Sequence, residues 1–291
     1  MASLEDEGVF ALGLDVVDPP VASPRQKYLN VSFSEFKVLE EEIKKNEVSH
    51  IVHLASSTLP KSSNEDMKYD ITSNVIGTLS LLEVAVKCGV KKLVYLSSGG
   101  TIYGPDVSTP IDEDHPTNPI CSYGIGKLAV EKYLNLFQHL HGLDYVALRA
   151  ANPYGPGQNP AGGQGLIANF LHKILTQQTI EIWGDGSIVR DYFYISDLVD
   201  LIKVSLESEV SGIFNAGSGA GASINQVLTL LEETLGASTN IAFQPHRHFD
   251  VPKIILDCSA AGRVFDWRAK TSLQDGVSRF ADWYRYRQNK R

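Results

Sequence analysis

Residues 92–104, KLVYLSSGGTIYG, form the stretch that decides the fold. The run from Lys92 to Leu96 is short and apolar, which predicts a buried strand, and serine, glycine and threonine follow it directly. About twenty residues further on, residues 123–127 read YGIGK and open an amphipathic stretch that predicts a helix. Polar residues that follow a parallel strand lie where open α/β sheets bind their ligands.

The same alternation of short apolar runs and longer amphipathic stretches continues on both sides of this segment. It predicts strands at residues 9–14, 51–54, 92–96 and 145–148, and helices at residues 35–46, 69–88, 123–141 and 272–286. Strands that alternate with helices are typical of βαβ units. We therefore predict an α/β protein with a doubly wound parallel sheet of the Rossmann type and a smaller C-terminal α/β domain.

Composition excludes several classes of function. The 291 residues carry a formal net charge of −8, which disfavours a nucleic-acid-binding protein because such proteins display a basic face. The three cysteines, Cys88, Cys121 and Cys258, are widely spaced and suggest neither a disulfide framework nor a metal site. Neither a membrane span nor a secretory signal is evident, so we expect a cytoplasmic protein without membrane partners.

Tyr123 and Lys127 are the residues that we expect to carry the chemistry. They are four positions apart, so both side chains lie on one face of the predicted helix. A free phenol titrates near pH 10, and a nearby ammonium group and hydroxyl donor would lower its pKa toward neutrality. Tyr123 is therefore a candidate proton acceptor, with Lys127 beside it and Thr101, or alternatively Ser98, as the hydroxyl partner.

Several motifs of the sequence resemble the NAD-dependent epimerase/dehydratase family, which is typified by UDP-glucose 4-epimerase and belongs to the extended short-chain dehydrogenase/reductases. The resemblance covers residues 9–283. Besides the segments above, the motifs begin at His53 (HLAS), Asn74 (NVIGT), Arg149 (RAANPYGP), Gly184 (GDGSIVRDY), Phe214 (FNAGS) and Arg247 (RHFD).

The resemblance implies a role for each matching position. It implies NAD as the cofactor, bound in a Rossmann-like domain over residues 1–155, and a nucleotide sugar bound over residues 156–291, of which some segments return to the first domain. The implied cofactor contacts are Asp15 (or Asp18), Asn30, Val31, Leu54, Ala55, Ser56, Asn74, Ser97, Tyr123 and Lys127. The implied substrate contacts are Asn152, Leu166, Trp183, Arg190, Tyr192, Arg247 and Asp250. Arginine suits such a site because its donor fork matches phosphate oxygens.

The start of the sequence departs from the family pattern. The family opens with an apolar strand and a GxxGxxG turn whose amides hold the cofactor pyrophosphate, whereas only Gly8 and Gly13 precede Gly77 here. We expect residues 1–8 to end the first helix and residues 9–14 to form the second strand. Two explanations remain open: the sequence starts within a longer protein, or this form is catalytically impaired. A missing central strand would leave unpaired edges on its neighbours.

Two further segments need interpretation. Gly99 stands where the best-known epimerases have a serine, which is why Thr101 or Ser98 is expected to supply the hydroxyl. The segment from Gly217 to Ala222 fits G-x-G-x-x-A, but no acidic residue follows about 20 residues later. We interpret Ser223 instead as the N-cap of a helix over residues 224–235.

The resemblance implies reversible oxidation at C4 of a UDP-hexose, with Tyr123 as the base and NAD as the hydride acceptor. A UDP-glucuronate decarboxylase or a 4-keto-sugar reductase using the same site is an alternative, and the absence of an Asp-Glu pair after Thr101 disfavours a dehydratase. A catalytically impaired sugar-nucleotide-binding protein is an alternative of another class. We also expect a homodimer formed through the helices at residues 69–88 and 123–141.

Overall fold

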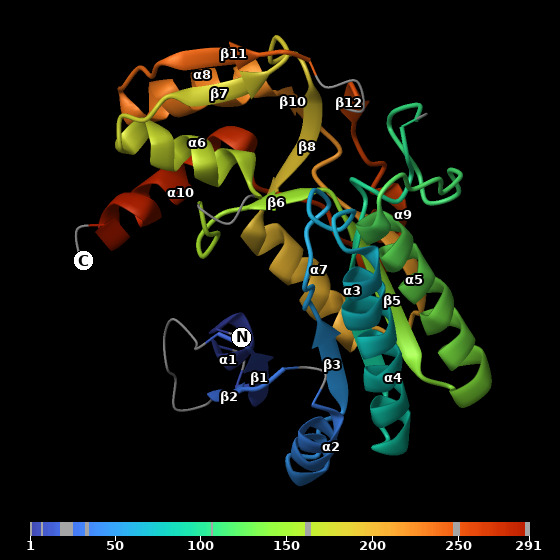
Figure 1. Cartoon of the computed structure of the whole chain (residues 1–291). Helices are drawn as coiled ribbons and strands as arrows, with labels where there is room; N and C mark the ends of the chain where they lie inside the picture. The colour runs from blue at the N-terminus through green and yellow to red at the C-terminus, as the bar shows by residue number, and fades with distance from the viewer. Residues whose placement is uncertain are drawn as a thin grey trace. The chain divides into compact units, whose positions relative to one another are not determined.

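The apolar run at Lys92 forms a strand, β4, which extends over Lys92–Ser98. Figure 1 shows the computed structural model of the chain. The structure describes residues 2–6, 8–17, 26–32, 35–105, 107–160, 164–246 and 251–288. Helices and parallel strands alternate along the chain, so the predicted α/β fold class is confirmed.

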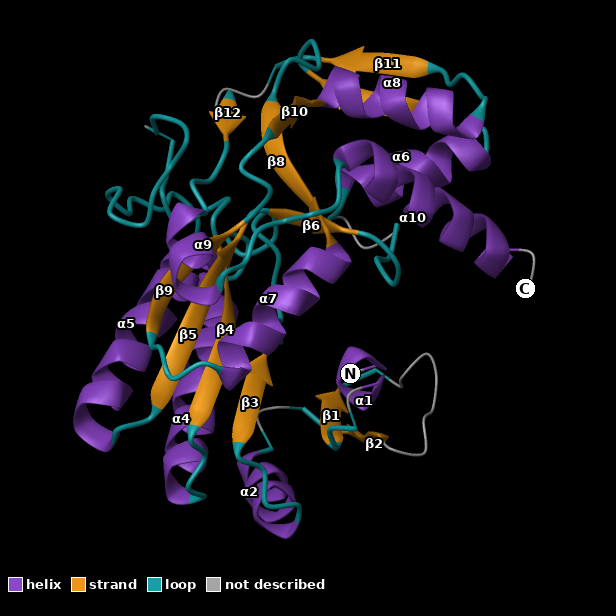
Figure 2. Ribbon diagram, turned by 180° about the vertical axis from the view of Figure 1, so that it is seen from behind, coloured by secondary structure: helices purple, strands orange, loops and turns teal. Residues whose placement is uncertain are grey.

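β4 belongs to a four-stranded sheet whose strand order is β3-β4-β5-β9 (Figure 2). The other three strands are β3 (His50–His53), β5 (Asp144–Ala150) and β9 (Gly212–Ala216). β3 and β4 run parallel, so the residues that follow them lie at the same edge of the sheet. This edge carries the loop after His53 and the serines that end β4.

Three helices cover one face of this sheet. They are α2 (Phe36–Lys45), α4 (Gly77–Lys87) and α5 (Ser122–His141). Their apolar side chains share one core with the strands, which includes the buried residues Leu39, Leu82, Leu93, Leu134 and Ala147. Each helix is amphipathic, so its apolar stripe can only be buried against the sheet.

The single helix predicted at residues 69–88 is more irregular than the sequence suggests. It starts earlier, as α3 (Met67–Asp70), continues as a π-helical segment, η1 (Ile71–Ile76), and ends as α4. Single π turns are rare and are frequent at functional sites. Gly89 follows with a φ of 72°, the left-handed conformation that glycine adopts at helix C-termini, as the sequence predicts.

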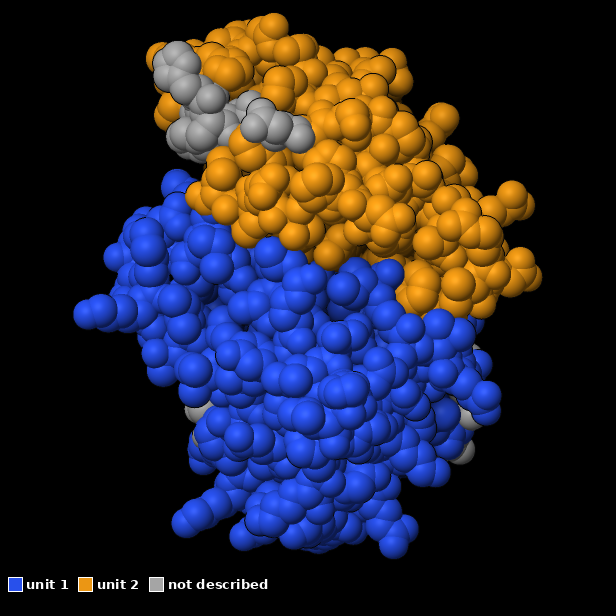
Figure 3. All heavy atoms as spheres, turned by 90° about the vertical axis from the view of Figure 1, so that its right-hand side faces the viewer, with its two compact units in different colours: residues 1–97, 121–148, 202–213 blue, residues 98–120, 149–201, 214–291 orange. Residues whose placement is uncertain are grey.

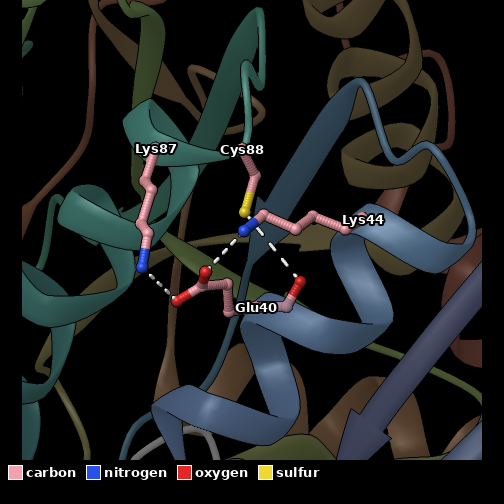
Figure 4. A network of polar contacts seen from close by, with 4 residues as sticks. All are labelled: Glu40, Lys44, Lys87 and Cys88. Carbon is pink, nitrogen blue, oxygen red and sulfur yellow. Dashed lines mark hydrogen bonds and ion pairs between the residues drawn. The ribbon is translucent and has the colours of Figure 1, made fainter.

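A polar network joins α2 to α4 (Figure 4). The carboxylate of Glu40 accepts hydrogen bonds from Lys44, one turn further along α2, at 2.6 Å and from Lys87 at 2.8 Å. The Cys88 thiol lies 3.9 Å from the backbone oxygen of Glu40. Exposed pairs of this kind add little stability, but they fix which turn of α2 faces the end of α4.

The N-terminal segment forms a separate pair of strands. Short helix α1 (Ala2–Asp6) precedes β1 (Ala11–Asp15), which pairs in parallel with β2 (Gln26–Asn30). β1 and β2 make a sheet of their own, and β3 is an end strand of the four-stranded sheet. One side of β3 therefore has no strand partner among the described residues.

The chain divides into two compact units, coloured in Figure 3. Unit 1 comprises residues 1–97, 121–148 and 202–213, and unit 2 comprises residues 98–120, 149–201 and 214–291. The chain thus passes between the units several times. No helix in the described ranges is both long and apolar enough to cross a membrane.

Unit 2 is built around β8 (Val189–Tyr194), which pairs with β6, β10 and β12. These partners are Asn152–Tyr154, Gly221–Ser223 and Lys253–Ile254. A second sheet pairs β7 (Ile180–Trp183) with β11 (Ile241–Gln244). The remaining helices are α6 (Leu166–Leu175), α7 (Ile195–Glu207), α8 (Ile224–Leu235), α9 (Ser259–Phe265) and α10 (Leu273–Gln288).

The predicted N-cap of α8 is confirmed, and it gives a stability test. The Ser223 hydroxyl accepts a hydrogen bond from the amide of Gln226 at 3.1 Å, and the Gln226 side chain accepts one from the Ser223 amide at 2.8 Å. We predict that Ser223→Ala lowers the free energy of unfolding by about 1 kcal/mol, since a free amide remains at the helix start. Ser223→Asp, which keeps an acceptor, should lose much less in the same urea titration.

Candidate active site

Tyr123 and Lys127 lie together at the start of α5, as the four-residue spacing predicts. The Lys127 ammonium nitrogen lies 5.4 Å from the centroid of the Tyr123 ring and 4.7 Å from that of Tyr95. It donates a hydrogen bond to the backbone oxygen of Leu96 at 2.8 Å. The lysine side chain thus holds the first turn of α5 against the end of β4.

Two side chains of the loop before α3 also hold the first turn of α5. The amide of Ser122 donates to Asn64 Oδ1 at 2.9 Å, and the amide of Tyr123 donates to Ser63 Oγ at 3.1 Å. These are two of the amides at a helix start that have no partner within the helix. The backbone that carries Tyr123 is therefore fixed by side chains of a distant loop.

Burial dominates the acid–base properties of the pair. Lys127 is only 6% exposed, and burial lowers its pKa to about 8, against the opposing effect of the Asp70 and Glu131 carboxylates. Burial also raises the pKa of Tyr123 to about 12, with further contributions from Cys121 and Asp70. The expected lowering of the phenol pKa is thus wrong for the chain by itself, because desolvation of the phenolate is the largest effect.

The loop after β3 carries the implied cofactor residues Leu54, Ala55 and Ser56, which are all exposed. Asn74 fastens this loop: its Oδ1 accepts from the Ser57 amide at 2.8 Å, and its Nδ2 donates to Thr58 Oγ1 at 3.0 Å. The structure therefore places Asn74 beside this loop, with its side-chain amide engaged in holding it, and a contact of Asn74 with the cofactor stays a prediction.

His53 ends β3 and is buried, which agrees with its interpretation as a structural residue. Its Nε2 lies 2.9 Å from Thr78 Oγ1, and that hydroxyl in turn donates to the backbone oxygen of Asn74 at 2.6 Å. Burial, with the nearby Lys127 ammonium, lowers the pKa of His53 to about 3. This imidazole is neutral at physiological pH.

Asp15 and Asn30 end β1 and β2 and lie at paired positions of the two strands, both exposed. Val31 follows, and its amide donates to the Asp15 backbone oxygen at 3.0 Å. An exposed carboxylate at a strand end is suited to bind a ribose diol.

Ser97, another implied cofactor contact, donates its hydroxyl to Glu131 Oε1 at 2.6 Å inside the core.

The two candidate hydroxyl residues lie in unit 2, where Thr101 Oγ1 donates to Ser98 Oγ at 2.9 Å. Gly99 lies between them in the sequence, and a Cβ at this position would come 2.6 Å from Leu256 Cδ1 and 3.0 Å from the Arg149 oxygen. A serine at position 99 would therefore require Leu256 to move, which explains the glycine. A contact of either hydroxyl with Tyr123 stays a prediction.

The implied substrate residues Asn152, Arg190 and Tyr192 meet on the paired strands β6 and β8. Asn152 lies opposite Tyr192, and its Nδ2 donates to the Asp191 backbone oxygen at 2.9 Å. Arg190 donates to the backbone oxygens of Val189 at 2.9 Å and of Val251 at 2.7 Å. The guanidinium is thus held in place by backbone carbonyls.

The remaining implied substrate residues are more scattered. Leu166 is the first residue of α6, and Trp183 is the last residue of β7 and 38% exposed. Tyr192 is buried, which raises the pKa of its phenol to about 12. Arg247 and Asp250 lie outside the described residues.

The glycine-rich segment after β9 donates its hydrogen bonds to a side chain of the protein itself. The buried carboxylate of Asp191 accepts from the Ser218 amide at 2.8 Å, the Ser218 hydroxyl at 2.6 Å and the Gly219 amide at 3.2 Å. A Cβ on Gly217 would come 2.5 Å from Asp191 Oδ2. The backbone amides that a phosphate would need are occupied by a carboxylate, so the structure supports the interpretation that this segment is not a dinucleotide site.

Three residues around the pair were missed by the sequence interpretation: Tyr95, Asp70 and Glu131. Tyr95 is recognisable only as an apolar strand residue, although its ring faces the Lys127 ammonium. Asp70 and Glu131 are buried carboxylates whose charges act on that ammonium. The position of Asp70, four residues before Asn74 on a predicted helix, is a weak signal that could have placed it on the same face.

Comparison with known proteins identifies the family of this chain. The sequence pattern of the "NAD dependent epimerase/dehydratase family" matches residues 2–217. The chain belongs to this family. It is 37% identical over 236 residues to a "UDP-glucose 4-epimerase" of Mycolicibacterium smegmatis, covering 81% of this chain and 75% of the relative.

Other members of the epimerase/dehydratase family match over most of their length. A "dTDP-4-dehydro-6-deoxyglucose reductase" of Escherichia coli is 34% identical, with 92% of this chain and 87% of the relative covered. Among solved structures, a UDP-glucose 4-epimerase of Thermotoga maritima with UDP-glucose has a TM-score of 0.94 at 33% identity, covering 99% and 94%. A UDP-glucose 4-epimerase of Thermus thermophilus in complex with NAD has a TM-score of 0.91 at 30% identity, covering 98% and 94%.

The low pKa of His53 gives a pH test of this part of the epimerase/dehydratase fold. The unfolded imidazole takes up a proton below about pH 6.5, whereas the folded one stays neutral, so folding stability falls as pH falls from 6.5 toward 3. Between pH 7 and 5 we predict a loss of about 2 kcal/mol from this residue alone. His53→Gln, which cannot titrate, should lose less stability over the same interval in urea titrations; an equal loss would contradict the assignment.

Proposed function

We propose that the chain catalyses the NAD-dependent epimerisation of a nucleotide sugar, at C4 of a UDP-hexose. The observation that carries this proposal is the Tyr123/Lys127 pair at the start of α5, beside the end of β4. Family membership and the likeness to 4-epimerases over nearly the whole chain support it. The structure known with NAD and the one with UDP-glucose support the cofactor and the substrate class.

The described residues of unit 1 fit NAD. Asp15 and Asn30 are exposed at neighbouring strand ends, where they would bind the adenosine ribose, and the exposed loop 54–56 would lie along the cofactor. Tyr123 and Lys127 would hold the nicotinamide ribose. When bound, NAD accepts the hydride from C4 of the sugar and returns it.

Tyr123 would take the proton of the C4 hydroxyl as the hydride leaves, and would return it in the second half of the reaction. With a pKa of about 12 in the chain alone, the phenol needs additional positive charge nearby to act at neutral pH. The oxidised nicotinamide, when bound, would supply such a charge. The base is thus active only when the site is loaded.

We infer that unit 2 binds the nucleotide diphosphate of the substrate. Arg190 and Asn152 lie on neighbouring strands, each held by a backbone carbonyl, and the donor fork of an arginine matches phosphate oxygens. Trp183 offers an exposed aromatic surface on β7. Arg247 and Asp250 would complete this site as the family pattern implies.

A cytoplasmic location agrees with the three free thiols at Cys88, Cys121 and Cys258.

Three rival functions would use residues of the same site. The similarity to a 4-dehydro-sugar reductase supports a reductase, which would consume external NADH, and a decarboxylase would release carbon dioxide. A protein that binds the nucleotide sugar without turnover is the rival from another class. Isothermal calorimetry with NAD and with UDP-glucose separates the last case, because such a protein would bind the sugar nucleotide alone.

The direct test is turnover of UDP-glucose, UDP-N-acetylglucosamine and UDP-glucuronate by the chain and by Tyr123→Phe. We predict that at least one sugar is epimerised and that Tyr123→Phe reduces kcat by about 100-fold or more, because the general base is lost. Tyr286→Phe, a matched change at an exposed tyrosine of α10, should retain activity. Absence of turnover of every sugar, with NAD saturating, would overturn the proposed function.

We further propose a homodimer formed through α4 and α5, because α5 and the residue directly before α4 carry exposed apolar side chains. On α5, Ile125, Leu136 and Leu140 are 53%, 42% and 59% exposed, and their spacing places them on one face of the helix. Ile76, the last residue of η1 and directly before α4, is 50% exposed. Exposed apolar stripes of this kind mark protein–protein interfaces.

Leu136→Glu should convert the dimer to a monomer, because it places a charge inside the proposed interface. Sedimentation velocity at micromolar concentration measures the change. Val264→Glu is the matched control, since Val264 is equally exposed, at 41%, but lies on α9 in unit 2. A monomeric wild-type chain, or a dimer that Leu136→Glu leaves intact, would contradict the interface.

A further inference from the structure

Asp70 is a buried carboxylate that the proposed reaction does not use. It is the last residue of α3 and is 1% exposed. Its Oδ1 accepts hydrogen bonds from Thr58 Oγ1 and from Asn74 Nδ2, the latter at 2.9 Å, and its Oδ2 accepts one from Ser122 Oγ at 2.6 Å. A buried carboxylate is costly unless such donors compensate it, so its presence needs an explanation.

The three donors come from three segments that each carry a residue of the candidate site. Thr58 belongs to the loop after β3, which carries Ser56. Asn74 belongs to the π-helical turn η1. Ser122 is the first residue of α5 and directly precedes Tyr123. One carboxylate therefore joins the predicted cofactor loop, the π turn and the start of the catalytic helix.

We propose that Asp70 is a positioning residue of the Tyr123/Lys127 site, which clamps these three segments together and supplies negative charge near the Lys127 ammonium. The role rests on the proposed function of that pair. Its acceptor bonds go to hydroxyls and an amide, so the carboxylate acts on Lys127 through space. The ammonium keeps its bond to Leu96 and its place beside the Tyr123 ring.

The packing of α5 brings Asp70 close to the pair. A Cβ on Gly126, the residue before Lys127, would lie 3.9 Å from Asp70 Oδ2, which is an ordinary van der Waals distance. The start of α5 therefore lies next to the carboxylate.

Negative charge is needed near Lys127 because burial disfavours the charged ammonium form of its side chain. The titratable groups around Lys127 are Asp70 on α3, Glu131 and Tyr123 on α5, Tyr95 on β4 and His53 on β3. Burial lowers the pKa of Lys127, and among the opposing effects the largest comes from Asp70. His53 adds no positive charge because its pKa lies far below neutrality.

The electrostatic part is tested by NMR titration of the lysine side chains in the full chain without ligands, with the Lys127 signal assigned from Lys127→Arg. Asp70→Asn keeps the size of the side chain and removes its charge, and should move the Lys127 midpoint from about 8 to lower pH, by about one unit. Ser122→Ala removes one donor but keeps the charge, and should leave the midpoint near that of the wild type. An unmoved midpoint in folded Asp70→Asn overturns this part.

The clamp is tested by hydrogen exchange in Ser122→Ala, which remains informative even where Asp70→Asn does not fold. Loss of the Ser122 hydroxyl should speed exchange of the amides at the start of α5, and those at its C-terminal end should keep their rates. Unchanged exchange at the start of α5 overturns the clamp. Both measurements need neither NAD nor a sugar, so their failure is distinguishable from an absence of turnover.

Discussion

The buried ammonium of Lys127 is the constraint on which the arrangement of unit 1 depends. An isolated ammonium in a protein interior costs several kcal/mol, and it can persist only with polar partners and nearby negative charge. Here the backbone oxygen of Leu96 accepts its hydrogen bond, and the rings of Tyr95 and Tyr123 lie around it. Those partners are available only while the first turn of α5 stays at the end of β4. The position of Tyr123 therefore follows from the need to keep polar partners around the Lys127 ammonium.

Each unit uses a buried carboxylate to hold its loops in place. Asp70 accepts donors from three segments of unit 1, and Asp191 accepts donors from the Ser218 segment and from the amide of Leu256 in unit 2. A loop has no ladder of its own, so its backbone needs partners of this kind when it is packed against the core. Both carboxylates bind the protein's own hydroxyls and amides.

The raised pKa of Tyr123 changes how its catalytic role is understood. Burial and the Asp70 carboxylate both favour the neutral phenol, and the same carboxylate favours the charged form of Lys127. The chain alone therefore holds a protonated tyrosine beside a lysine that titrates near neutral pH. A cationic ligand beside the phenol would lower the pKa of Tyr123.

Local patterns determined most of the fold. The strand at Lys92, the helix that starts beside Tyr123, the glycine after Cys88 and the Ser223 cap all follow from periodicity and from the short-range chemistry of helix ends. The four-residue spacing also placed Tyr123 and Lys127 side by side. Only the tertiary structure decided the direction of the phenol pKa, the need for Gly99 beneath Leu256 and the part played by Asp70, whose partner Ser122 is 52 residues away. Desolvation and hydrogen bonds between distant segments arise when the chain packs, and no local spacing encodes them.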